Sequence, residues 1–225
     1  MRAGTERKAS GDGAVVAAKT LLHAAALLPL ALLGWKAWLV GGGGDIDALG
    51  ADPVAAIEHE LGLWALRLLL VTLAVTPLRQ LLGQPALLRF RRMLGLWAFA
   101  YARLHFCAWL VLDLRGWWSH VFVEIAERPY ITVGFAAWLL LVPLAVTSTR
   151  GWMRRLGRNW GRLHRLVYAI AALAVLHFWL VGKSDGREPL LDAAILAAML
   201  GWRLRRRRQP RARPRAPASA GAEQQ

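Results

Sequence analysis

The sequence predicts an all-α fold, a polytopic membrane protein built as a six-transmembrane-helix bundle with both ends of the chain in the cytoplasm. Three observations support this prediction. Hydrophobic residues make up 56% of the 225 residues, more than is usual for a soluble domain. Six apolar segments come close to the roughly 20 residues that a helix needs to cross the hydrocarbon core. The connections between them are alternately rich and poor in Lys and Arg, as the positive-inside rule requires of an even number of helices.

The expected spans follow one another along the chain at residues 21–40, 61–82, 94–112, 130–147, 166–182 and 189–204. The first has an apolar core too long for a cleavable signal peptide, and no convincing small-residue cleavage site follows it. The last is the weakest, because Pro189 begins it and Arg203 nearly ends it. We therefore divide the chain into a cytoplasmic N-terminal segment (1–20), a transmembrane domain (21–204) and a disordered basic cytoplasmic tail (205–225).

The positive charge of the chain reflects its topology. The formal net charge is +15, but the basic residues gather before the first span, after the second, after the fourth and in the tail, whereas residues 41–60 contain acidic side chains and no Lys or Arg. We therefore expect membrane lipid rather than nucleic acid as the partner of these charges. The single cysteine, Cys107, allows neither an intrachain disulfide nor a thiolate metal cage.

The candidate functional residues are histidines, because ionisable groups at membrane depth are costly and mark functional sites. His105 lies seven residues before the outer end of the third span, and His177 five residues before the outer end of the fifth. Both are therefore about 8–10 Å below the outer ends of helices that run in the same direction. Two facing imidazoles in a helix bundle suit the iron of a haem, whereas a structural zinc would need four ligands. We expect His105 and His177 to be the axial ligands of one haem, the alternative being that each only hydrogen-bonds a neighbouring helix.

His164 is the third candidate for cofactor binding and metal ligation. It lies 13 residues before His177, roughly 20 Å nearer the cytoplasm, so it cannot share the same iron and leaves a second haem open. On an ideal helix this spacing puts the two side chains about 140° apart, which also leaves a local helix distortion open. The remaining histidines, His23, His59 and His120, are expected at wet surface positions. Six inner arginines are expected to set topology, with haem propionates or a flavin phosphate as alternative partners: Arg91, Arg92, Arg154, Arg155, Arg158 and Arg162.

The sequence contains no nucleophile–base pair, nucleotide-binding loop or pair of catalytic carboxylates. We therefore assign no catalytic residues and expect an electron-transfer subunit of an oxidoreductase system rather than its catalytic subunit. A transporter or assembly protein without redox chemistry is the alternative from another class. Such transporters usually show internal repeats or broken helices, and we find neither in the sequence.

Several short motifs follow one another along the chain in a specific order and spacing. They are Gly-Ala-Asp-Pro-Val at 50–54, Thr-Pro-Leu at 76–78, Arg-Arg-Met-Leu-Gly-Leu-Trp at 91–97, Leu-His at 104–105, Arg-Pro-Tyr-Ile-Thr-Val-Gly at 128–134, Thr-Ser-Thr at 147–149, and Leu-Gly-x-x-Trp-x-x-Leu-His-x-x-Val-Tyr at 156–168, followed by His177. Together they resemble the MsrQ family within the ferric-reductase-like transmembrane superfamily. The similarity covers about residues 20–205. It implies haem-associated positions at His105, His164 and His177.

The resemblance also implies properties that composition and spacing do not. These are haem b, flavin mononucleotide (FMN), and the quinone pool or a flavin reductase as electron donor. The implied partner is a periplasmic molybdopterin-containing methionine sulfoxide reductase catalytic subunit, which would repair oxidised periplasmic proteins. The implied location is the bacterial inner membrane. A ferric-reductase-like oxidoreductase with another partner is the alternative within redox chemistry.

Overall fold

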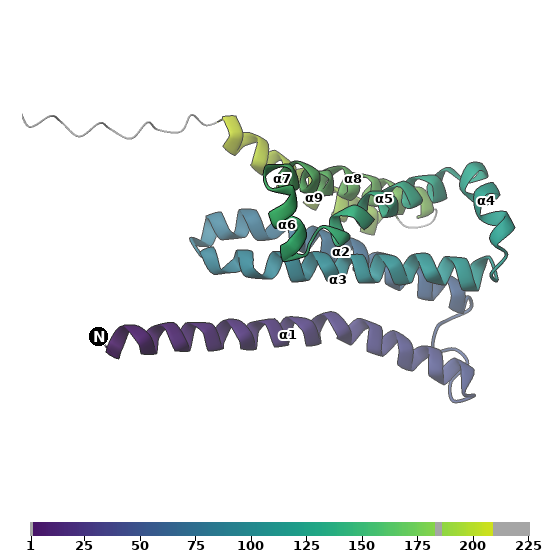
Figure 1. Ribbon diagram of the computed structural model, residues 1–225. Coiled ribbons are helices and arrows are strands. Elements are labelled where there is room, and N and C mark those ends of the chain that lie inside the picture. The colour runs from purple at the N-terminus through teal and green to yellow at the C-terminus, as the bar shows by residue number, and fades with distance from the viewer. Residues whose placement is uncertain (1, 183–185, 209–225) are drawn as a thin grey trace, which may run out of the picture.

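The computed structural model describes residues 2–182 and 186–208, and every regular element in these ranges is a helix (Figure 1). The α-helices are α1 (Arg2–Gly41), α2 (Pro53–Leu82), α3 (Leu88–Ala108), α4 (Val121–Glu127), α5 (Pro129–Val146), α6 (Arg150–Leu156), α7 (Arg158–Leu163), α8 (Val167–Val181) and α9 (Arg187–Arg208). Three single 3₁₀ turns are η1 (Pro85–Leu87), η3 (Trp118–His120) and η4 (His164–Leu166), and a π-helical turn, η2 (Trp109–Asp113), continues α3. The predicted all-α membrane fold is confirmed.

Short polar and proline signals set where the helices begin. The Asp52 carboxylate accepts a hydrogen bond from the Ala55 N–H at 3.0 Å, and Pro53 occupies the first turn of α2, a combination that starts helices because the first N–H groups have no partner within the helix. Helix α2 therefore begins eight residues before the predicted start at 61. The prediction that Glu58 and His59 lie in an outer loop was wrong, and both belong to α2.

The long helices run alternately in opposite directions and pack as two antiparallel pairs, α2 with α3 and α5 with α8, while α9 covers α2 and α8 (Figure 1). The best-buried side chains lie where these helices meet: Leu73, Ala98, Tyr101, Ile170 and Ala171. Helix α1 lies along one side of the bundle, and little of its surface is buried. Two hydrogen bonds tie it to α3, from Tyr101 Oη to the Ala26 carbonyl (2.6 Å) and from Trp97 Nε1 to His23 Nδ1 (2.9 Å).

Within residues 2–182 and 186–208, five helical stretches are long and apolar enough to cross a membrane, and they match the first five predicted spans: Val15–Gly41, Pro53–Leu82, Pro85–Asp113, Pro129–Val146 and Arg158–Val181. Helix α9 covers the sixth predicted segment, but it contains too many charged residues to count among these apolar stretches. Nη2 of Arg67 on α2 lies 3.8 Å from Oε1 of Glu188 on α9. Nη2 of Arg203 on α9 donates a hydrogen bond to the Leu73 carbonyl on α2 at 3.2 Å. These contacts hold α9 against the bundle, and a sixth span stays a prediction.

At both ends of the chain, the helices extend past the predicted limits of the transmembrane domain. Helix α1 begins at Arg2, so residues 2–20 continue into the first span as one helix. Residues 205–208 belong to α9 rather than to the predicted tail, and residues 209–225 lie outside the described residues, as do 183–185. The cytoplasmic location of both ends stays a prediction.

Candidate functional site

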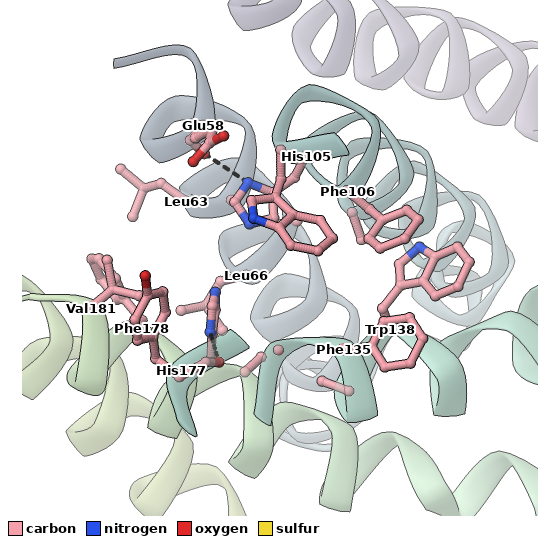
Figure 2. Close-up of a pocket in the computed structure, with 18 of the residues that line it drawn as sticks. Glu58, Leu63, Leu66, His105, Phe106, Phe135, Trp138, His177, Phe178 and Val181 are labelled. Atoms are coloured by element: carbon pink, nitrogen blue, oxygen red, sulfur yellow. Dashed lines mark hydrogen bonds between the residues drawn. The ribbon is translucent and has the colours of Figure 1, made fainter. Parts of the chain in front are cut away.

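A cavity of about 290 Å³ lies between α2, α3, α5 and α8, close to the ends of these helices that are predicted to face outward (Figure 2). Most of its wall is apolar, with Leu66, Phe106, Phe135 and Phe178 among the lining residues. The described part of the lining contains no Lys or Arg. An apolar cavity with a few polar groups, near the lower end of the usual size range, is typical of a cofactor or ligand site.

The first polar group is His105, on α3. Its Nδ1 lies 2.9 Å from the backbone carbonyl of Glu58 on α2. A carbonyl oxygen can only accept, so Nδ1 carries the ring proton and donates it. The lone pair of the neutral imidazole is therefore on Nε2, which is the arrangement found in metal-binding histidines.

His177, on α8, repeats this arrangement. Its Nδ1 donates to the backbone carbonyl of Tyr130 on α5, at 2.7 Å. The Tyr130 hydroxyl in turn accepts from Arg128, which also pairs with Glu124 at 2.8 Å. The hydrogen bond to Tyr130, followed by the charge of Glu124, raises the pKa of the Arg128 guanidinium above its ordinary value. The start of α5, which supplies the acceptor for His177, is thus fixed by a charged cluster outside the span.

Each imidazole fits against a glycine one helical turn after its acceptor. A Cβ atom on Gly62 would lie 3.2 Å from Cε1 of His105, and one on Gly134 would lie 2.8 Å from Cε1 and Nδ1 of His177. In both helix pairs the glycine precedes the histidine by 43 residues. Neither glycine was predicted to belong to the site, and no repeat was predicted. The equal Gly-to-His spacing is nevertheless visible in the sequence. These glycines let the rings reach carbonyls that side chains on α2 and α5 would otherwise shield.

The two imidazoles face each other across the cavity (Figure 2), with ring centres 6.1 Å apart and planes at 67°. With bonds of about 2.0–2.1 Å from imidazole nitrogen to metal, one ion between two such rings separates their centres by about 6 Å. The spacing, the free Nε2 lone pairs and the apolar wall therefore fit a metal held by two axial histidines, as in a haem. Among the described residues no group of three or more His, Cys, Asp or Glu side chains could hold a metal ion by itself.

His164 lies elsewhere, in η4 at the other end of α8. Its Nε2 is 3.1 Å from Thr147 Oγ1, and its ring stacks on Trp160 with centres 4.0 Å apart. The Thr147 hydroxyl gives its proton to the Pro143 carbonyl at 2.6 Å, so it accepts from His164 Nε2–H. The 3₁₀ turn between His164 and α8 is a distortion of the kind that the spacing of 13 left open.

Three other histidines were expected at wet surface positions. His23 accepts a hydrogen bond from Trp97 of α3. His59 lines the cavity, and its Nε2 lies 3.7 Å from Oε2 of Glu188. His120 is exposed, as expected. None of the six inner arginines lines the cavity.

The chain is similar to known proteins over most of its length. The family model described as "Ferric reductase like transmembrane component" matches residues 61–175. Three relatives carry the name "Protein-methionine-sulfoxide reductase heme-binding subunit MsrQ". Those from Xanthomonas euvesicatoria pv. vesicatoria, Xanthomonas oryzae pv. oryzae and Bordetella pertussis are 70%, 66% and 50% identical to the chain. The matches cover 84%, 92% and 83% of this chain and 87%, 95% and 88% of the relatives.

No solved structure matches the chain. The family model covers half of the sequence, and the Xanthomonas oryzae relative matches 92% of it. The apolar helices and the bacterial relatives together indicate a multi-pass protein of the bacterial inner membrane. The chain belongs to the MsrQ family of ferric-reductase-like transmembrane proteins.

Proposed function

We propose that this chain binds one haem b between His105 and His177, in the outer half of the membrane, and acts as the electron-carrying subunit of a methionine sulfoxide reductase system. The observation that supports this most directly is the pair of imidazoles 6.1 Å apart, each with Nδ1 bonded to a backbone carbonyl. The relatives are named haem-binding subunits, which also supports haem binding by this chain.

Each part of the cavity has a task in this proposal. Nε2 of His105 and Nε2 of His177 would hold the iron, and the carbonyls of Glu58 and Tyr130 keep both rings in the tautomer and orientation that this requires. The aromatic and aliphatic wall excludes water, which lets a buried cofactor keep a defined potential. When bound, haem supplies a reversible one-electron carrier.

The direction of transfer in the proposal follows the predicted orientation. Electrons from the quinone pool or a flavin donor enter near the inner surface, where His164 stacks on Trp160. They leave at the outer side for a periplasmic methionine sulfoxide reductase that carries a molybdenum cofactor. FMN and a second haem at His164 belong to the same proposal. A second haem would require His164 to give up the bond to Thr147 or to bind through Nδ1.

The test is the absorption spectrum of the purified full chain and of three single variants. His105→Ala and His177→Ala each remove one ligand, so each should lose haem or give a five-coordinate spectrum. His120→Ala is the matched control, because this histidine is exposed and lies outside the cavity lining. Haem content like that of the unchanged protein in both ligand variants would refute the assignment.

The same preparations separate the alternatives. A transporter or assembly protein would show no Soret band at all. A ferric-reductase-like oxidoreductase with another partner would show the band, but its haem would not be reoxidised by a methionine sulfoxide reductase.

A further inference from the structure

Three residues that line the cavity each have a buried polar atom without a hydrogen-bond partner. Among the described residues these are the indole Nε1 atoms of Trp109 and Trp138 and the Oε1 atom of Glu58. Trp109 as a whole is only 9% exposed. A buried N–H without an acceptor costs free energy, and such groups in a cavity wall indicate a ligand that supplies the acceptor.

Both indoles contact the ring of Phe106. Trp109 begins the π-helical turn η2, one helical turn beyond His105, and its ring centre is 5.8 Å from that of Phe106. Trp138 lies one turn beyond Gly134 on α5 and stacks on Phe106, with ring centres 4.4 Å apart and planes at 19°. Phe106, Phe135 and Trp138 form an aromatic group beside His105 (Figure 2).

The charged residues of the lining bear on which acceptor groups of a haem could bind here. A haem has two carboxylates, and proteins commonly meet such groups with Arg or Lys. The described lining has neither, and the inner arginines Arg91 and Arg92 do not contribute to it. Two neutral N–H donors are available instead. Glu58 Oε1 is an acceptor when ionised and does not suit another carboxylate.

We propose that the indole N–H groups of Trp109 and Trp138 donate hydrogen bonds to the propionate carboxylates of the haem. This inference rests on the proposed haem site and adds two binding residues to it. One donor comes from η2, which continues the helix α3 that carries Phe106, and the other comes from α5, which carries Phe135. By binding the propionates, the two indoles would determine which edge of the haem faces α3 and α5.

The test compares two probes, haem and haem dimethyl ester, in which both carboxylates are blocked while ring and iron are unchanged. The full chain, depleted of haem, is titrated with each, and the ratio of the two affinities is measured. The unchanged protein should prefer haem. Trp109→Phe and Trp138→Phe keep an aromatic ring and remove the N–H, so each should lower haem affinity by about tenfold or more and change ester affinity little. Trp117→Phe is the control, because Trp117 is exposed and does not line the cavity.

Two results would overturn the inference. One is an unchanged preference for haem in both variants. The other is equal binding of haem and its ester by the unchanged protein, which requires no variant and is therefore independent of folding defects. Failure of the haem site itself looks different, because neither probe would then give a two-histidine spectrum with the unchanged protein.

Discussion

Gly134 is the position where the smallest chemical change should have the largest effect on the site. A methyl group there would lie 2.8 Å from two atoms of the His177 ring, closer than real side chains approach one another. The ring cannot retreat without lengthening its 2.7 Å hydrogen bond to the Tyr130 carbonyl. Gly134→Ala should therefore displace His177, the proposed iron ligand, while it removes no polar group.

The magnitude follows from three contributions. Overpacking costs about 1–3 kcal/mol, and loss of the hydrogen bond costs about 0.5–1.5 kcal/mol. Replacing glycine by alanine within a helix returns up to about 1 kcal/mol. The net loss of about 0.5–4.5 kcal/mol corresponds to a roughly 2- to 2,000-fold weaker affinity for haem.

The chain offers a graded set of controls for this substitution. Gly62→Ala places its methyl group 3.2 Å from the His105 ring, so its effect should be smaller. Gly95→Ala places its methyl group 3.6 Å from Cγ2 of Thr72, an ordinary contact, and should change nothing. Haem titration and the reduced spectrum of all three variants provide the measurement. Equal affinity in Gly134→Ala and Gly95→Ala would show that the close approach of glycine and histidine is not needed.

Three further predictions concern the bundle and its inner end. Tyr101→Phe removes a buried bond to α1 and should cost about 1–3 kcal/mol in the free energy of unfolding with an unchanged haem spectrum; an unchanged melting temperature would contradict it. Thr147→Val removes the acceptor of His164 and should slow haem reduction by a quinol while leaving the absorption bands of the outer haem alone; equal reduction rates in variant and unchanged protein would count against a role of His164 in electron entry. Reporter fusions after Asp52 and Glu124 should read as external and one after Arg208 as cytoplasmic; an external signal after Arg208 would leave α9 outside the membrane.

Hydropathy and charge were sufficient for the five long spans, because their apolar lengths are set by the bilayer rather than by tertiary contacts. The same reasoning failed at the start of α2. Glu58, His59 and Glu60 resembled a polar outer loop, whereas the cap formed by Asp52 and Pro53 starts the helix before them. Local capping there outweighs average hydropathy.

The site was accessible from sequence only in part. Matched depths brought His105 and His177 together correctly, because depth along a spanning helix can be counted in residues. The role of Gly62 and Gly134 depends on which helices pair, and the contacts of His164 with Thr147 and Trp160 depend on packing. The unpartnered indoles of Trp109 and Trp138 are properties of packing, which no residue spacing encodes.

The contacts that fix each imidazole lie within one helix pair. His105 and its acceptor belong to α2 and α3, and His177 and its acceptor belong to α5 and α8. During biogenesis, each half can therefore set the tautomer of its own histidine soon after insertion, before the halves meet. Haem would then join two preformed halves and, by binding only their assembled state, shift the assembly equilibrium toward it. Cofactor supply would thereby govern how much of the newly inserted protein reaches its mature form.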